Sequence, residues 1–126
     1  TCALPICLVT EQAAFLLDMC KLIQFATEQG FTLTAGELYR TPEQQEIYMK
    51  TGRSSTMNSL HLVRLAVDFN IFKDGKLVGS KATLAPLGAY WESLNPLNSW
   101  GGNGKKLVDT PHFSRGQGKP EWVRVT

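Results

Sequence analysis

The sequence predicts an α+β fold, a small antiparallel sheet with flanking helices, and three observations point to it. Apolar residues recur with the helical period over residues 10–29 and again over 84–94. Residues 31–38 alternate between apolar and polar side chains, which is typical of a strand with one buried face. An Asp-Gly turn at residues 74–75 joins two β-rich segments as a hairpin. Helices mixed with antiparallel strands define the α+β class.

The first helix is expected over residues 10–29, with Thr10 as its N-cap and Gly30 at its end. Its predicted buried face is the stripe of residues at helical spacing: Ala13, Leu16, Leu17, Cys20, Ile23 and Phe25 or Ala26.

The three cysteines all lie in the first twenty residues, and their odd number means that they cannot all pair within one chain. None has the Cys-x-x-Cys spacing of a metal knuckle. Cys20 falls on the apolar stripe of the first helix, so we expect it to be a small core residue. Whether Cys2 and Cys7 form a disulfide is left open by the sequence.

A second helix begins after a capping sequence. Thr41 suits the N-cap, Pro42 suits the first helical position, and Gln44 can complete a capping box. Gly52 is expected to end this helix, and residues 53–58, which are polar and rich in Ser and Thr, are expected to form a loop.

The remaining elements are mostly strands. Residues 65–72 are apolar and β-rich, and residues 76–78 return after the hairpin turn. The third helix is expected over residues 84–94, and short strand pieces are expected at residues 100–102 and 111–114.

Length and composition limit the classes of protein that the chain can represent. With 126 residues, it is expected to form one domain, residues 1–126, with a single core. A hydrophobic content of 43% and a charged content of 19% are typical of a globular protein. The net charge of +2 suits an anionic polymer such as a bacterial wall, whereas the scattered basic residues predict no nucleic-acid partner. No stretch reaches the roughly 20 apolar residues of a membrane span. We expect the protein to be a monomer.

The chain contains only two histidines, and each stands in a short motif that can bind a metal. His61 precedes the strand that contains Asp68, and a bend between them would bring both side chains to one ion. Asp68 has apolar neighbours, and a carboxylate in a buried strand needs a cation or several donors. His112 follows Asp109 by three residues. Two imidazoles and one carboxylate are the usual ligands of a catalytic zinc, which keeps its fourth position open.

Each of these residues also has an ordinary interpretation. His61 can be a solvated loop side chain, and Asp109 can either close a turn or act as the acid/base beside zinc-activated water. Arg40 can form a surface ion pair or stabilise the oxyanion of a tetrahedral intermediate. The Trp100-Gly101-Gly102 segment can be a turn with a core Trp, or a place where substrate backbone approaches closely.

Taken together, the motifs resemble a family of zinc peptidases that contains D-alanyl-D-alanine carboxypeptidases, dipeptidases and L-alanyl-D-glutamate endopeptidases. Ser59-x-His61-x6-Asp68 and Asp109-x-x-His112 carry the resemblance. Further stretches match in the same order: residues 39–44, 68–75, 87–94, 100–102 and 109–114. The likeness is strongest to small phage and prophage endolysins.

The resemblance implies a metal centre with one zinc ion per chain. Its implied ligands are His61, Asp68 and His112, with Asp109 as the catalytic acid/base and Arg40 as an electrostatic helper. It also implies the compact α+β fold shared by D,D-peptidases and the signalling domain of Hedgehog proteins.

Other residues are implied to support this centre. Ser59 would orient a ligand, and Trp100 and Gly101 would either support the site or bind substrate. The chain departs from the family at Arg64, where many members have Gly. We expect Arg64 to reach the substrate or solvent.

We therefore expect a zinc-dependent peptidase that hydrolyses the stem peptides of peptidoglycan at the bacterial cell wall or in the periplasm, with a phage or prophage origin. L-Ala–D-Glu endopeptidase activity is the first hypothesis, and D-Ala-D-Ala carboxypeptidase activity is the alternative. A rival of another class is a non-catalytic binding module that keeps zinc for structure, as Hedgehog relatives do. Asp109 argues against this rival, because a structural site has no use for a base.

Overall fold

The computed structural model describes residues 8–54, 59–105 and 107–116. The helices in these ranges are α1 (Leu8–Glu28), α2 (Pro42–Lys50) and α3 (Lys81–Leu94), with 3₁₀ turns η1 (Leu60–Val63) and η2 (Gly101–Asn103). The strands are β1 (Phe31–Ala35), β2 (Ala66–Lys73), β3 (Lys76–Leu77), β4 (Asn98–Trp100) and β5 (His112–Arg115). The sheet has the order β1-β2-β5-β4, with β3 paired to β2, and every pairing is antiparallel. The α+β prediction is confirmed.

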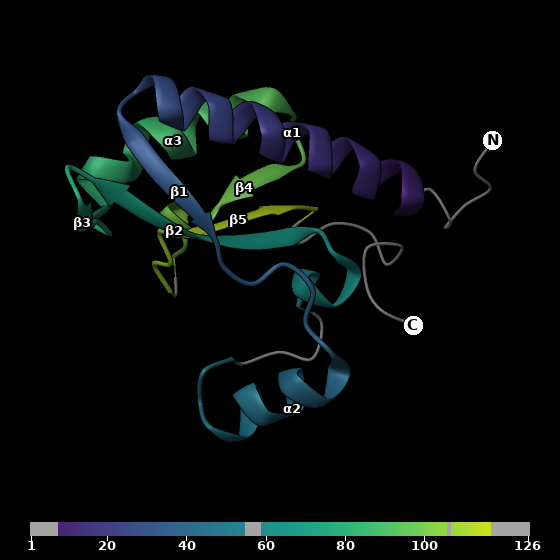
Figure 1. The fold of residues 1–126 in the computed structure, drawn as a ribbon. Coiled ribbons are helices and arrows are strands. Elements are labelled where there is room, and N and C mark those ends of the chain that lie inside the picture. The colour runs from purple at the N-terminus through teal and green to yellow at the C-terminus, as the bar shows by residue number, and fades with distance from the viewer. Residues whose placement is uncertain (1–7, 55–58, 106, 117–126) are drawn as a thin grey trace.

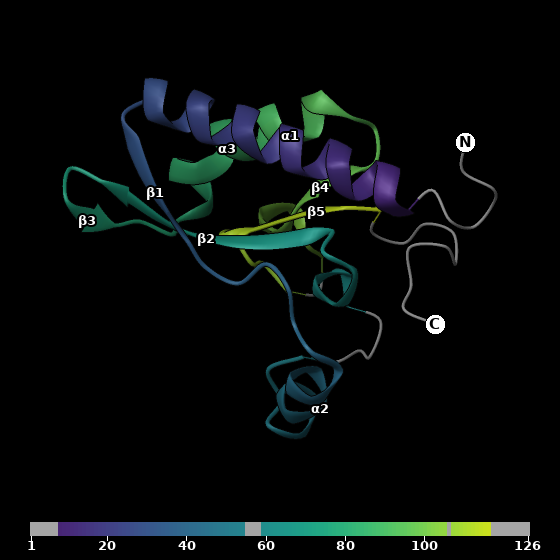
Figure 2. The ribbon, with the colours of Figure 1, turned by 45° about the vertical axis from the view of Figure 1, so that its right-hand side comes forward.

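The elements form two layers, and a third region stands apart from them. α1 and α3 cover one face of the sheet, whereas α2 lies on the opposite side, beyond η1 (Figures 1 and 2). None of the described helices is both long and apolar enough to cross a lipid bilayer.

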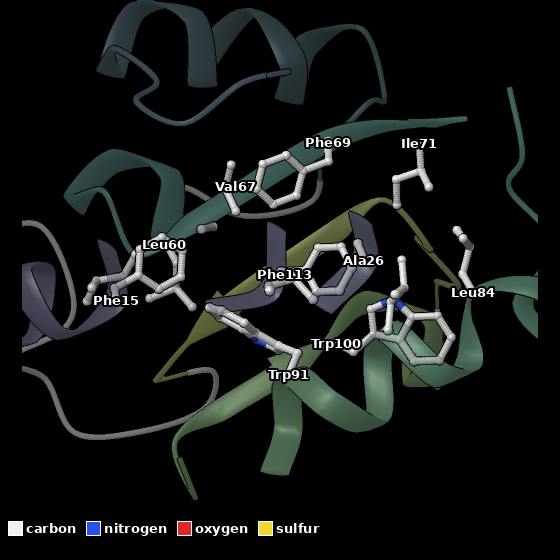
Figure 3. Close-up of a cluster of buried hydrophobic side chains, with 14 of the residues drawn as sticks. Phe15, Ala26, Leu60, Val67, Phe69, Ile71, Leu84, Trp91, Trp100 and Phe113 are labelled. Carbon is white, nitrogen blue, oxygen red and sulfur yellow. The ribbon is translucent and has the colours of Figure 1, made fainter. Parts of the chain in front are cut away.

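The core fills the space between the sheet and the two helices that cover it. Figure 3 shows Phe113 of β5 at its centre, between Phe69 of β2 and Trp91 of α3. The ring centroid of Phe113 lies 6.0 Å from that of Phe69 and 5.9 Å from that of Trp91. All three rings are buried.

Strand β2 has one face in this core and one face outside it. Val67, Phe69 and Ile71 are buried against the helices. Because side chains alternate along a strand, Asp68 and Asn70 point to the other face, where Asp68 is half-buried and Asn70 is exposed. The strand therefore presents a carboxylate on the face that the two covering helices leave open.

Most of the predicted buried face of α1 is wrong, although Ala26 is buried as predicted. The helix buries Phe15, Leu22 and Ala26, whereas Leu16, Leu17 and Ile23 are exposed. Cys20 is a free, exposed thiol and not a core residue. The helix carries two apolar stripes, and a period of 3.6 residues cannot by itself decide which one is buried.

A buried polar network explains which stripe faces the core. Asp18 is buried on α1, and its Oδ2 accepts hydrogen bonds from Asn98 of β4 at 3.1 Å and from Arg115 of β5 at 3.4 Å. The Nε of Arg115 also donates to Glu11 at 2.7 Å. A buried charge needs such partners. The face of α1 that carries Asp18 therefore turns toward β4 and β5, and the other apolar stripe of the helix faces solvent.

Several predicted boundaries are also corrected. α1 begins at Leu8, so Thr10 lies inside the helix and is not its cap. α3 begins three residues before the predicted start, because the Oγ of Ser80 caps it by accepting from the Thr83 amide at 3.1 Å. The strand expected at residues 100–102 ends at Trp100. Cys2 and Cys7 lie outside the described residues.

The predicted N-cap of α2 and the predicted hairpin turn are confirmed. The Oγ1 of Thr41 accepts from the Gln44 amide at 3.1 Å, with Pro42 as the first residue of α2. Asp74 and Gly75 both have positive φ, at 53° and 76°, as a two-residue hairpin turn requires. These motifs are predictable because they depend on neighbouring residues alone.

One glycine in α3 allows the helix to lie directly on an indole ring. A Cβ at Gly88 would come within 2.1 Å of the Trp100 ring, which is buried and cannot move aside.

We expect Gly88→Ala to lower the free energy of unfolding by about 2 kcal/mol, since the overpacking exceeds the gain in helix propensity. Denaturant midpoints measure this loss. Gly79→Ala is the control, because a Cβ there meets only Thr110 Oγ1 at 3.9 Å. Equal midpoints for the two variants would contradict the prediction.

Candidate metal centre and active site

Two of the predicted ligands face each other across neighbouring strands. Asp68 of β2 is the antiparallel partner of His112 of β5. Directly opposed residues project to the same face of a sheet, and the Oδ1 of Asp68 lies 3.0 Å from the Nδ1 of His112. The register of the sheet thus places this pair.

The third predicted ligand, His61, comes from the 3₁₀ turn before β2. Ser59 caps this turn, with its Oγ accepting from the His61 amide at 3.2 Å. The Nδ1 of His61 lies 2.9 Å from the Leu38 carbonyl oxygen. A carbonyl only accepts, so the neutral ring carries its proton on Nδ1 and presents a lone pair on Nε2. That Nε2 lies 3.4 Å from the Oδ2 of Asp68.

The three side chains have the spacing that a zinc ion requires. One ligand atom from each of His61, Asp68 and His112 can be chosen so that all lie within 4.8 Å of one another. Tetrahedral zinc with bonds of about 2.0–2.1 Å places its ligand atoms about 3.3 Å apart. Each imidazole lies near this distance from one oxygen of Asp68: His112 Nδ1 is 3.0 Å from Oδ1, and His61 Nε2 is 3.4 Å from Oδ2. Among the described residues, this is the cluster that can hold a metal ion.

The charge state of Asp68 suits a metal ligand. Burial opposes its ionisation, but its contacts with His112 and then with His61 outweigh burial, so the pKa of Asp68 lies well below its usual range. The carboxylate is therefore ionised at neutral pH, and its negative charge is held between the two imidazole rings.

Asp109 is held beside this cluster by its own backbone. Its amide donates to the Gly101 carbonyl at 2.9 Å, and its carbonyl accepts from the His112 amide at 3.2 Å. A Cβ at Gly101 would come within 2.1 Å of the Asp109 carbonyl oxygen. The space beside Gly101 is thus filled by this loop and not by substrate backbone, so Gly101 positions Asp109 and His112.

The loop that carries Asp109 is fixed at two more points. The indole nitrogen of Trp100 donates to the Thr110 carbonyl at 2.8 Å, and the Thr110 hydroxyl donates to the Gly79 carbonyl at 2.7 Å. Trp100 is both a core side chain and an anchor for this loop. This double role is not visible in the sequence motif alone.

Asp109 takes up a proton more readily than an ordinary aspartate. Burial is the main cause that raises its pKa, and the charge of Asp68 raises it further, against the opposing effect of His112. A carboxyl group that gains and loses a proton nearer to neutral pH is suited to acid/base catalysis. The raised pKa of Asp109 thus suits a group that accepts and donates a proton, whereas the lowered pKa of Asp68 suits a metal ligand.

Arg40 enters the site already bound to other side chains. Its guanidinium donates to Glu37 through Nε at 2.7 Å and through Nη2, to Gln45 through Nη1 at 2.7 Å, and to Ser59 through Nη1 at 3.4 Å. These four hydrogen bonds use four of the five N–H groups of an arginine. Within the described part of the chain, one Nη2 hydrogen is left to donate elsewhere.

Two cavities meet at the cluster. The larger, of about 610 Å³, is lined by all three predicted ligands and by Asp109 and Arg40. Others of its lining residues are Arg53, Ser59, Trp100, Gly101 and Lys105. The smaller, of about 320 Å³, shares Arg40, Arg53, Asp68 and Asp109 with it. An extended chain can therefore lie across the cluster with a part on each side.

Arg64 lies outside both cavities. Its φ of 57° places it in the left-handed region, at the C-cap of η1, a backbone conformation that glycine adopts most easily. Its guanidinium carbon lies 4.0 Å from the centroid of the Tyr39 ring. Arg64 is exposed, as expected for a side chain that reaches solvent, and it lines neither cavity.

Sequence reasoning missed three residues of the site: Glu37, Tyr48 and Arg53. The Tyr48 hydroxyl donates to Glu37 at 3.4 Å, and the guanidinium carbons of Arg40 and Arg53 each lie 4.7 Å from the Tyr48 ring centroid. Tyr48 and Arg53 are five residues apart at the end of α2. An aromatic residue followed by Arg just after a helix C-terminus was the available sequence signal.

Comparison with known proteins identifies the family. A family model described as D-alanyl-D-alanine carboxypeptidase matches residues 52–115. An L-alanyl-D-glutamate peptidase of Listeria phage A118 is 38% identical over 97 residues, which is 74% of this chain and 34% of that protein. The chain belongs to this peptidase family.

A solved structure supports membership of the D-alanyl-D-alanine carboxypeptidase family. The L-Ala D-Glu endopeptidase ChiX of Serratia marcescens superposes with a TM-score of 0.64 at 25% identity, over 78% of this chain and 77% of that chain. The chain spans about a third of the length of the phage relative. The matched residues 52–115 contain all three predicted ligands and Asp109.

Proposed function

We propose that the protein is a zinc-dependent peptidase that hydrolyses the L-Ala–D-Glu bond of peptidoglycan stem peptides. The observation that carries the proposal is the half-buried Asp109 beside the His61–Asp68–His112 cluster, where two cavities meet. The phage and Serratia relatives are both named for L-Ala–D-Glu cleavage.

Each residue has a distinct task in the proposed reaction. Zinc, when bound by the three ligands, would supply Lewis acidity that polarises the scissile carbonyl and acidifies water. Asp109 accepts a proton from water as the water oxygen bonds to the carbonyl carbon. When the C–N bond breaks, Asp109 donates that proton to the departing nitrogen. Arg40 directs its remaining N–H toward the oxyanion from a position already set by Glu37.

A second candidate is D-Ala-D-Ala carboxypeptidase activity, which the description of the matching family model favours. Both reactions use the same attack on an amide carbonyl, so the site residues do not discriminate between them. The non-catalytic module is disfavoured, because a structural zinc site needs no carboxylate with a raised pKa in an adjacent cavity.

Digestion of purified peptidoglycan tests the proposal. Zinc-loaded protein is expected to release new N-terminal amines, and a chelator is expected to stop the release. Mass spectrometry of the products separates the candidates, because stem peptides that begin at D-Glu indicate the endopeptidase and free D-alanine indicates the carboxypeptidase. Release of neither product at any zinc loading would exclude both activities.

A further inference from the structure

Arg53 is a cation that lines both cavities of the site and that is not paired with a carboxylate of the described residues. No hydrogen bond or ion pair joins its guanidinium to a carboxylate of the described residues, whereas Arg40 is paired with Glu37. Arg53 thus brings an uncompensated positive charge to the place where a substrate would cross from one cavity to the other.

The Arg53 guanidinium is also held in a defined position. Its central carbon lies 4.7 Å from the centroid of the Tyr48 ring, and Tyr48 is itself tied to Glu37 through its hydroxyl. A guanidinium over an aromatic face is attracted to the ring and can still donate hydrogen bonds from its N–H edge. The free edge can donate two parallel hydrogen bonds, which is the geometry that a carboxylate accepts.

The two arginines are therefore suited to different groups. Arg40 has one N–H left after four hydrogen bonds within the described chain. One N–H can donate to a single oxyanion, but a bidentate contact with a carboxylate needs two. Its charge is balanced by Glu37. Arg53 has both the charge and the donors for a carboxylate.

In both candidate substrates, the residue on the amine side of the scissile bond has a free carboxylate. D-Glu has two carboxyl groups, and a stem peptide that continues beyond it uses only one in the next amide bond, so the other stays ionised. In D-Ala-D-Ala the residue on the same side of the scissile bond has a free terminal carboxylate. Asp68 and Asp109 line the smaller cavity and would repel such a charge, whereas Arg53 in the same lining would attract it.

We propose that Arg53 is a specificity-determining residue, which binds the free carboxylate of the residue on the amine side of the scissile bond. This inference rests on the proposed function, and it adds the feature by which the substrate is selected. It predicts that the enzyme distinguishes a carboxylate from a carboxamide at that residue.

Two synthetic stem peptides test the inference. One contains L-Ala–D-Glu with the free carboxylate, and the other has a carboxamide in its place. We expect the zinc-loaded wild-type protein to prefer the carboxylate by about 10- to 100-fold in kcat/KM, as for a charge-assisted pair. In Arg53→Gln the preference should fall to nearly one, through a higher KM for the carboxylate peptide. Arg53→Lys should restore part of the preference.

Two further variants serve as comparisons. Arg64→Gln removes an exposed cation outside both cavities and should keep the full preference. Lys105→Gln removes another cation of the larger cavity; if this variant loses the preference and Arg53→Gln keeps it, the inference is overturned. Equal cleavage of both peptides by the wild-type protein would also overturn it. Cleavage of neither peptide would overturn the proposed function itself, and this inference with it.

Discussion

Asp109→Asn is expected to lower kcat by a factor of about 10² to 10⁴ while leaving the zinc content of the protein unchanged. The substitution keeps the size of the side chain and removes the group that takes and returns the proton. The backbone bonds from Asp109 to Gly101 and His112 do not depend on the side chain, so the loop should keep its place. Steady-state cleavage of a synthetic stem peptide, together with metal analysis, measures both properties.

The matched control for this loss is Asp74→Asn. Asp74 is an exposed carboxylate in the β2–β3 turn, and Asn tolerates its positive φ of 53°. This variant should have wild-type activity. If Asp109→Asn is equally active, Asp109 has no part in proton transfer, and the acid/base role must be assigned elsewhere.

Loss of either histidine is expected to abolish zinc-dependent activity and zinc-dependent stabilisation together. A ligand that binds only the folded state at 1,000 times its Kd stabilises it by about 4 kcal/mol, which raises the Tm of a domain of this size by on the order of 10 °C. We expect this rise when zinc is added to metal-free wild-type protein. His61→Ala and His112→Ala should show little or none of it.

The chain offers a direct control for the thermal shift. Cys20 is an exposed thiol that could bind zinc without any relation to the site, and Cys20→Ser should retain the full shift. With only two histidines in the chain, no third imidazole can take over the role of a ligand. A full shift in His112→Ala would therefore remove His112 from the metal centre.

From the sequence we selected three residues that the fold brings together, but not the face of α1 that packs on the sheet. His61, Asp68 and His112 were expected to share an ion, and the register that pairs Asp68 with His112 brings them together. The choice of these residues depended on their chemical type and on the combined motif. Neither requires knowledge of the neighbouring helices.

The packing of α1 could not be predicted in the same way. Its orientation depends on Asp18 meeting Arg115, a partner 97 residues away in the sequence. A local period contains no information about such a pair, so the stripe with Cys20 was wrongly placed in the core. The same limit applies to Arg53, whose proposed role depends on cavities formed by distant segments.

The hydrogen bond from His61 to the Leu38 carbonyl has a consequence for how this protein tolerates change over evolutionary time. The acceptor that decides which imidazole nitrogen faces Asp68 belongs to the main chain. A point mutation can replace any side chain, but it cannot delete a peptide carbonyl. Residue 38 can therefore vary in identity while the same nitrogen of His61 stays available to the proposed zinc, provided that the local backbone keeps its course.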